Sequence, residues 1–139
     1  MKFISLLFFA AFFMNASLSF AQKKDYNPNK NNYLIVSKNI QQLPPILLTA
    51  QELSQKDGRK FGELRVVFCG KTVTEFQKKE IVEWFQKAQK AGVKVYVCGL
   101  SLKKFNIDAT SLDQSVKVVE NGITFSFEMQ QKKFYVLTI

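Results

Sequence analysis

Residues 63–99 read ELRVVFCGKTVTEFQKKEIVEWFQKAQKAGVKVYVCG, and this stretch decides the fold. Two apolar, β-branched runs predict strands over residues 63–69 and 93–97. Between them, residues 79–91 carry apolar side chains at helical spacing and lead into a glycine. A strand, a helix and a second strand within about 35 residues predict a right-handed crossover between two parallel strands.

Each of the two strands ends in a cysteine followed by a glycine, at Cys69-Gly70 and Cys98-Gly99. If the strands are parallel neighbours, both thiols emerge at the carboxyl edge of the sheet, where open α/β sheets place their binding crevice. The chain contains no histidine, the commonest general base and a common metal ligand. Two cysteines without histidine make a poor zinc site, so we expect neither a metal nor another cofactor.

The remaining sequence continues the alternation of strands and helices. Apolar segments predict strands over residues 33–37, 116–119 and 134–139. Pro44 and Pro45 open a helix that ends at Asp57-Gly58, and residues 100–105 predict a short helix.

One segment is ambiguous by pattern. Residues 123–131 suit either a strand or a helix, and Asn121-Gly122 before them suits a turn or a hairpin. With either outcome the sequence predicts an α/β fold, a three-layer sandwich in which a mostly parallel sheet of about five strands carries helices on both faces.

The first residues predict the compartment. Lys2, an apolar run over residues 3–14, and small residues at Ser19 and Ala21 form the pattern of a cleaved secretory signal peptide over residues 1–21. The run falls short of the ~20 residues that span a bilayer, so a membrane anchor is the weaker alternative. We expect a periplasmic or secreted protein with no stable membrane insertion once the signal is removed.

The rest of the chain predicts a leader and one domain. Residues 22–32 are rich in Lys, Asp, Pro and Asn and predict a flexible leader. Residues 33–139 are enough for one core but not two. The net charge of +9 comes from scattered lysines, without the basic stripe and interleaved aromatics of a nucleic-acid site. We therefore expect no nucleic-acid partner and interpret the charge as a solvated surface.

Four segments share a recognisable pattern: residues 92–102, 107–108, 116–122 and 130–136. Together they resemble the DsrE/DsrF-like family of small sulfur-relay proteins, in its secreted branch. The sharpest element is the cysteine after the third strand, followed by a short helix. The resemblance implies a parallel sheet with flanking helices, an oligomer, and a cysteine that holds a transferred sulfur as a persulfide. That cysteine corresponds to Cys98.

The sequence departs from the family pattern in two places. Similar secreted members tend to show a histidine followed by a glycine where this chain has Cys69-Gly70, so a second thiol replaces a polar ring. Residues 130–134 also lack the glycine that often precedes the final aromatic strand.

The physical argument for Cys98 is independent of the resemblance. A thiol at the start of a short helix lies near unpaired backbone amides and the positive end of the helix dipole, and Lys103 and Lys104 add positive potential. These effects lower a thiol pKa and favour a nucleophile. The alternative is a buried structural cysteine that packs as a small hydrophobic residue.

Cys69 has three interpretations: a buried residue at a strand end, a resolving or relay partner for Cys98, or one half of a structural disulfide. Neighbouring strands lie ~4.8 Å apart, within the range that a disulfide accepts. Whether the sulfurs meet depends on register and on which face each side chain takes. We favour free or reversibly bonded thiols, because a domain of this size has enough core without a permanent bond.

Two hypotheses follow for function. In the first, the protein is a sulfurtransferase-like carrier. Cys98 is its acceptor thiol, the amides of Gly99 and Leu100 stabilise the anion, and Gly70 and Ser101 complete the binding set. In the second, it is a non-catalytic module that binds a small ligand or a partner, with structural cysteines. We also expect a homo-oligomer, because edge strands rich in Val, Phe and Tyr are a liability in a monomer.

Overall fold

The computed structural model describes residues 24–139, so the predicted signal peptide lies outside the described part of the chain. Within that part, five strands form one sheet: β1 (Asn31–Ser37), β2 (Phe61–Phe68), β3 (Lys94–Cys98), β4 (Val116–Val119) and β5 (Tyr135–Thr138). The α-helices between them are α1 (Leu43–Asp57), α2 (Lys79–Lys90), α3 (Gly99–Lys104) and α4 (Gly122–Gln131).

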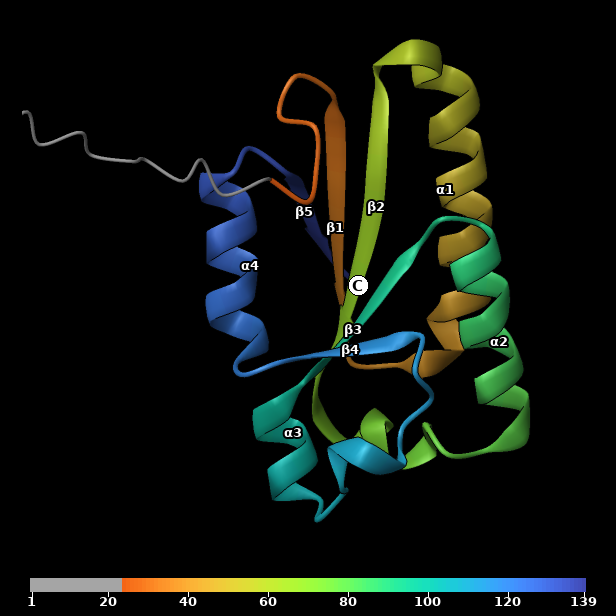
Figure 1. Cartoon of the computed structure of the whole chain (residues 1–139), viewed down its shortest axis with the longest axis vertical. Coiled ribbons are helices and arrows are strands. Elements are labelled where there is room, and N and C mark those ends of the chain that lie inside the picture. The colour runs from red at the N-terminus through yellow and green to blue at the C-terminus, as the bar shows by residue number, and fades with distance from the viewer. Residues whose placement is uncertain (1–23) are drawn as a thin grey trace, which may run out of the picture.

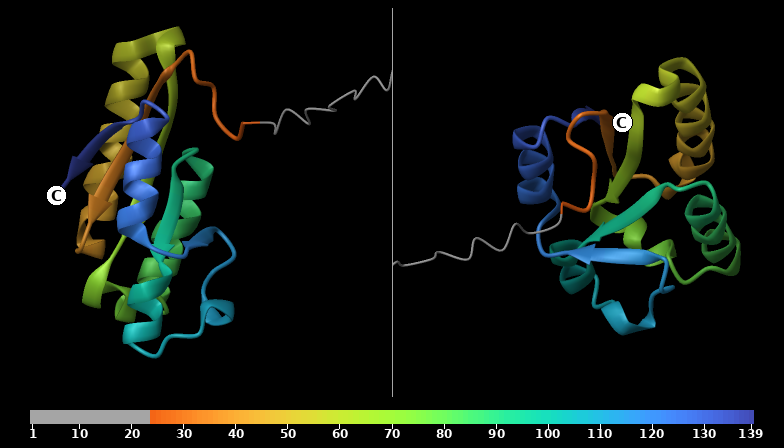
Figure 2. Two further views of the ribbon diagram at one scale, coloured as in Figure 1. Left: turned by 90° about the vertical axis from the view of Figure 1, so that its left-hand side faces the viewer. Right: turned by 45° about the horizontal axis from the view of Figure 1, so that its top comes forward.

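The strand order is β4-β3-β2-β1-β5, and every neighbouring pair is parallel. Helices α1 and α2 cover one face of the sheet and α4 covers the other (Figures 1 and 2). Helix α3 follows β3 directly, beyond the carboxyl edge of the sheet (Figure 1). The predicted α/β sandwich is confirmed, and the sheet is parallel throughout.

Helices α1 and α2 begin and end close to where the sequence predicts. Prolines occupy the first turn of α1, where an amide has no helical partner, and Gly58 ends the helix with a φ of +55°, which glycine adopts without strain. Helix α2 buries Ile81, Phe85 and Ala88 and exposes its charged residues. Both helices therefore present one apolar stripe to the same face of the sheet.

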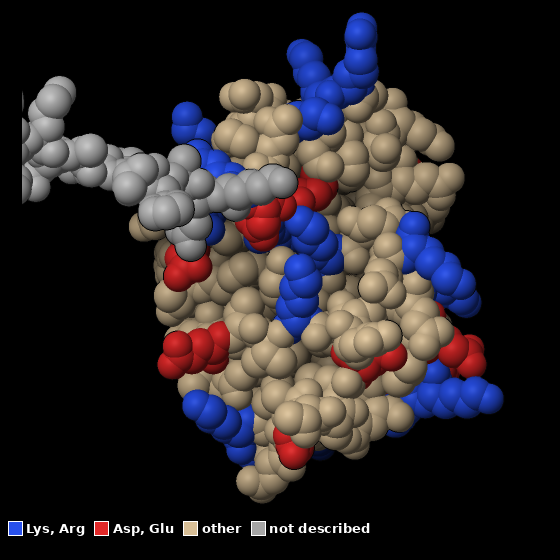
Figure 3. Space-filling view, viewed as in Figure 1, with Lys and Arg blue, Asp and Glu red and all other residues tan. Residues whose placement is uncertain are grey.

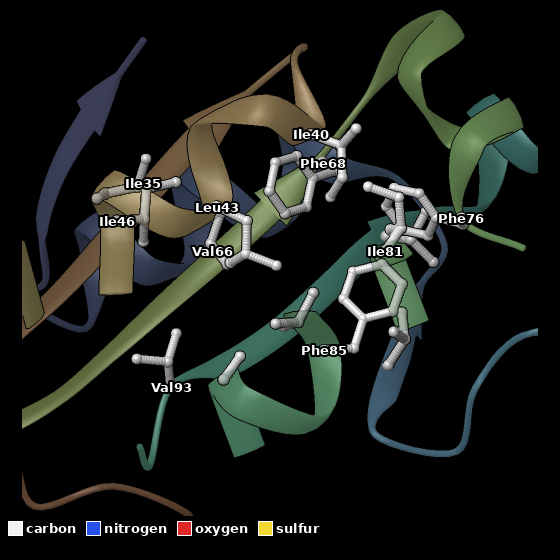
Figure 4. Packing of buried hydrophobic residues seen from close by; sticks show 14 of the residues in the cluster. Ile35, Ile40, Leu43, Ile46, Val66, Phe68, Phe76, Ile81, Phe85 and Val93 are labelled. Atoms are coloured by element: carbon white, nitrogen blue, oxygen red, sulfur yellow. The ribbon is translucent and has the colours of Figure 1, made fainter. Parts of the chain in front are cut away.

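The face under α1 and α2 holds the larger core. Its centre is a row of buried rings (Figure 4): Phe68 packs edge-on against Phe76 with 5.8 Å between ring centroids, and Phe76 against Phe85 at 4.9 Å. Aliphatic side chains from β1, β2 and β3 fill the space around these rings. Full burial of each such side chain contributes about 1.5–3 kcal/mol.

The face under α4 holds a smaller core of six buried residues: Leu34, Val67, Tyr96, Phe125, Met129 and Phe134. It also contains a buried cation, because Arg65 on β2 is only 2% exposed. The guanidinium carbon of Arg65 lies 4.9 Å from the ring centroid of Phe134 and 5.8 Å from that of Tyr96. Ion pairs with Glu63 and with Asp25, the latter at 2.9 Å, compensate the buried charge.

Residues 24–30, the N-terminal strap, run across the part of the α4 face that contains Arg65. Besides the Asp25 ion pair, the Tyr26 ring packs on Phe134 with 5.1 Å between centroids, and the Lys94 ammonium donates to the Asp25 carbonyl at 3.0 Å. The sequence places this segment in a flexible leader and starts the domain at residue 33. The structure starts β1 at Asn31 and joins the strap to the domain through Arg65.

The ambiguous segment is a helix. Residues 123–131 belong to α4, and Asn121 is its N-cap, with extended backbone and a side-chain oxygen that accepts the Ile123 amide hydrogen at 2.9 Å. Asn121-Gly122 is thus a helix start rather than the predicted turn or hairpin. This places Gly122 directly beside the carboxyl edge of the sheet.

The cationic side chains are dispersed over the face shown in Figure 3, with neutral and acidic surface between them. Among residues 24–139, no helix is both long and apolar enough to cross a membrane.

Candidate functional site

The two cysteines lie on neighbouring strands in matched register. Strands β2 and β3 pair Val67 with Tyr96 and Phe68 with Val97, so Cys69 and Cys98, the next residues, stand opposite each other. Because side chains alternate along a strand, both sulfurs lie on the α4 face together with Val67 and Tyr96. Both cysteines are free thiols. The structure thus brings together the two cysteines that the sequence singles out.

Gly122, the first residue of α4, contacts both of them. Its amide donates to the Cys98 sulfur, with 3.3 Å between nitrogen and sulfur. A Cβ atom on Gly122 would lie 2.5 Å from the Cys69 sulfur and 3.3 Å from the Cys98 Cβ. Only glycine leaves room for the pair. Gly122 was not among the site residues predicted from the sequence, although Asn121, a favoured N-cap, was the signal that a helix starts here.

Cys98 is the more acidic thiol. Burial opposes its ionisation, but hydrogen bonds from the Gly122 amide, from the backbone and side chain of Ser101 and from the Leu100 amide outweigh burial and lower the pKa of Cys98. This is the direction that the sequence predicts, and the first-turn amides of α3 contribute as expected, with Gly122 as an additional donor. Lys103 and Lys104 are not among the largest contributions, and the Lys104 ammonium lies 5.7 Å from the ring centroid of Phe105.

The other predicted site residues build the loops around the sulfurs. Ser101 is buried, and its hydroxyl accepts the Gly70 amide hydrogen at 2.8 Å, which ties the two Cys-Gly loops together. The Leu100 amide donates mainly to the Glu120 carbonyl, at 3.1 Å, so its share in stabilising Cys98 is small. Gly99 packs closely on the end of β4, and its amide is not among the donors found for the Cys98 sulfur.

Cys69 is the less acidic thiol and is only half-buried. Burial, the negative charge on Cys98 and a hydrogen bond to Cys98 raise the pKa of Cys69 from 9.0 to about 12, and the nearby Lys38 ammonium opposes this change only in part. In the singly ionised state, the negative charge therefore resides on Cys98 and the proton on Cys69. In that state the pair consists of a buried thiolate on Cys98 and a protonated thiol on Cys69.

Cys69 lines a cleft of about 300 Å³ between α4 and strands β1 and β5. Its apolar walls are Val36, Ile123, Phe127 and Val136, and its polar lining includes Lys38, Ser126 and Gln130. Cys98 is 5% exposed and does not line this cleft. A molecule that enters the cleft therefore meets Cys69 first.

Within the described part of the chain, no group of three or more His, Cys, Asp or Glu side chains is arranged to hold a metal ion. The chemistry available at the site is that of sulfur: nucleophilic attack by a thiolate, proton exchange between two thiols, and persulfide or disulfide formation.

The chain is similar to one family of known proteins. The model of the DsrE/DsrF-like family matches residues 46–139, which include both cysteines and Gly122. The chain belongs to the DsrE/DsrF-like family. No curated protein matches the chain.

Solved structures of this DsrE-like fold include three that superpose well. A protein of unknown function, MTH1491 from Methanobacterium thermoautotrophicum, has a TM-score of 0.65 at 15% identity, over 79% of this chain and 99% of its own. BT1422 from Bacteroides thetaiotaomicron, also of unknown function, gives 0.60 at 13%, over 78% and 95%. The ychN protein from E. coli gives 0.54 at 16%, over 79% and 99%. At these identities the similarity establishes the fold alone.

Proposed function

We propose that this protein carries sulfane sulfur as a persulfide on Cys98, with Cys69 as the relay thiol. Membership of a family with a sulfur-relay type of fold supports the reaction class. The observation that carries the assignment of residues is the Gly122 amide on the Cys98 sulfur, because a thiolate with a fixed hydrogen-bond donor in a buried site is a stabilised nucleophile.

The transfer needs no net oxidation. Cys69 gives its proton to the Cys98 sulfur, and the Cys69 thiolate attacks the terminal sulfur of a donor R–S–SH. The donor S–S bond breaks, and R–S⁻ leaves with the electron pair and takes the proton back from Cys98. The Cys98 thiolate then attacks the terminal sulfur on Cys69. Cys98 becomes the persulfide Cys98–S–S⁻, the electron pair of the broken bond returns to the Cys69 sulfur, and the proton of the transferred S–H passes to Cys69.

Intact mass spectrometry tests this proposal. The reduced protein, incubated with inorganic polysulfide at neutral pH, is expected to gain about 32 Da per transferred sulfur, and dithiothreitol is expected to remove the gain. Cys98→Ser should abolish stable loading, whereas Cys69→Ser should slow it.

Each variant needs a thermal melt to show that it is folded. Stable loading of a folded Cys98→Ser protein to the wild-type level would contradict the proposal. It would favour a module whose buried Cys98 is structural.

We also propose export to the periplasm or beyond, on the basis of residues 1–21 alone. Sequencing of the N-terminus of the protein recovered from cells should then begin near Gln22. A homo-oligomer is proposed for a structural reason: β5 is an edge strand, and its Tyr135 and Leu137 are 62% and 60% exposed. A sedimentation coefficient of a monomer at all micromolar concentrations would contradict the oligomer.

A further inference from the structure

The cleft beside Cys69 has a composition that selects among sulfur donors. Four of its lining residues are aliphatic or aromatic, and two of these, Ile123 and Phe127 on α4, are 67% and 62% exposed at its rim. Lys38 is the one charged residue among the lining residues, and it forms no ion pair with any described carboxylate. The cleft thus combines apolar walls with a single unpaired positive charge.

The positive charge lies on the same side as the reactive sulfur. Lys38 acts electrostatically on Cys69, and a Cβ on Gly70 would lie 3.9 Å from the Lys38 side chain. The exposed apolar residues of the rim come from α4, whereas Lys38 and Cys69 follow strands β1 and β2. A bound molecule therefore meets charge and thiol at the strand ends and apolar surface from α4, Val36 and Val136.

We infer that the sulfur donor of this protein is a small organic persulfide with an apolar body and one anionic group. This inference rests on the function proposed above. The cleft volume of about 300 Å³ is at the lower end of small-molecule sites, so the donor is a small molecule. Its anion pairs with Lys38, its apolar body lies against Ile123 and Phe127, and its terminal sulfur reaches Cys69.

Inorganic sulfur dianions suit this cleft less well. A dianion that entered the cleft would lose its hydration and gain only apolar walls and one lysine. Desolvation of such a strongly solvated charge is unfavourable. Three larger cavities, of about 430, 500 and 710 Å³, are lined by residues that include no cysteine. The cleft beside Cys69 is therefore the approach to the sulfur pair that the described residues offer.

With this donor, sulfur transfer follows the same two steps as in the proposed relay. The sulfane sulfur moves from R–S–SH to Cys69 and then to Cys98, and the donor leaves as the thiol R–SH. No oxidant or reductant is consumed.

The experiment compares two donors that differ only in charge, mercaptohexanoate persulfide and mercaptohexanol persulfide, with inorganic polysulfide as the reference. The rate of loading is followed by intact mass. The wild-type protein should load from the carboxylate donor about three- to fivefold faster than from the alcohol, the size of one partly exposed ion pair. Lys38→Met should abolish that preference, and Phe127→Ser should slow both organic donors about threefold.

Two matched variants serve as controls. Lys71→Met removes a lysine of the same sheet edge that does not line the cleft, and Val118→Ser alters an exposed apolar residue on the distant edge strand β4. Neither should change loading from any donor. Inorganic polysulfide should load Phe127→Ser and both control variants at the wild-type rate, because it needs no apolar contact. It should load Lys38→Met more slowly, because polysulfide is itself an anion that Lys38 attracts.

The outcomes separate this inference from the proposed function. If polysulfide loads the protein but Lys38→Met and Phe127→Ser leave both organic rates unchanged, the inference fails and the relay stands. If polysulfide does not load Cys98 at all, the proposed function is wrong, and the inference that depends on it is wrong as well. If Phe127→Ser lowers the sedimentation coefficient without changing loading, this face is an interface between copies of the chain, and the inference is overturned.

Discussion

The two faces of the sheet differ in how they are filled. The α1 and α2 face is closed by two helices over a row of interlocked phenylalanine rings, and its core is apolar beside two buried hydroxyl groups, those of Ser37 and Thr72. The α4 face is closed by one helix and contains a buried arginine, two thiols and an adjoining cleft. Both faces use the same strands, with alternate side chains pointing to opposite sides. The sheet thus combines a rigid support with a face that tolerates polar and reactive groups.

The largest effect is expected on the supporting face. Phe85→Ala removes a buried ring that contacts Phe76, and should lower the free energy of unfolding by about 3–5 kcal/mol in urea titrations. Because the ring lies on the face opposite the thiols, the alkylation rate of Cys98 in the folded variant should remain that of the wild type. Gln86→Ala, which changes an exposed neighbouring residue, is the control and should change the free energy of unfolding little. An altered alkylation rate of Cys98 would show that the two faces of the sheet are coupled.

A smaller loss is expected at the buried cation. Arg65→Ala removes the partner of Glu63 and Asp25 and opens a space beside the Tyr26 and Phe134 rings, at a cost of about 3 kcal/mol. Release of the strap should also speed tryptic cleavage at Lys30, read by mass spectrometry. Arg59→Ala, on the exposed surface, should change neither measurement. Unchanged protection of Lys30 in Arg65→Ala would mean that Arg65 does not hold the strap.

The sequence predicts these two faces unequally. Regular spacing identified α2 and its buried stripe, and two apolar runs ending in Cys-Gly placed both thiols at one edge of the sheet, because both signals are local. The donor at Gly122 and the partners of Arg65 come from elements distant in sequence, brought together by register and helix packing. An arginine is expected in solvent. The sequence therefore predicted neither the aromatic rings and carboxylates that surround Arg65 nor the N-terminal strap that covers it.

Gly122→Ala probes the junction between α4 and the thiols. The added methyl would collide with the Cys69 sulfur, so α4 must shift, at a cost of about 1–3 kcal/mol. The shift weakens the hydrogen bond to Cys98, and alkylation of Cys98 by iodoacetamide at pH 7 should slow. Gln131→Ala, at the other end of α4, is the matched control. A wild-type alkylation rate in Gly122→Ala would show that the Gly122 amide does not activate Cys98.

The pH dependence gives the smallest and most specific effect. The lowered pKa of Cys98 stabilises the fold fully above the unfolded thiol pKa of ~8.5, and this contribution is lost as the pH falls through the folded pKa. The raised pKa of Cys69 has the opposite sign. Its contribution is complete below ~8.5 and is lost as the pH rises toward about 12.

The measurement is the difference in unfolding free energy between the wild type and each Cys→Ser variant across pH. Relative to Cys69→Ser, the wild type should lose stability between pH 9 and pH 12. Relative to Cys98→Ser, it should gain stability as the pH rises toward the unfolded pKa. Parallel curves for the wild type and both variants would show that the two thiols titrate independently of the fold.

Strand order also sets the sequence of events during synthesis. β1 leaves the ribosome early, yet one of its two neighbours is β5, and Tyr33 pairs with Tyr135 about a hundred residues later. α4 and β5 follow every other element, so a nascent chain completes its α1 and α2 face while the thiols still lack a cover. In ribosome-bound chains arrested before α4, alkylating reagents should therefore reach Cys98 more readily than in released chains, where it is 5% exposed.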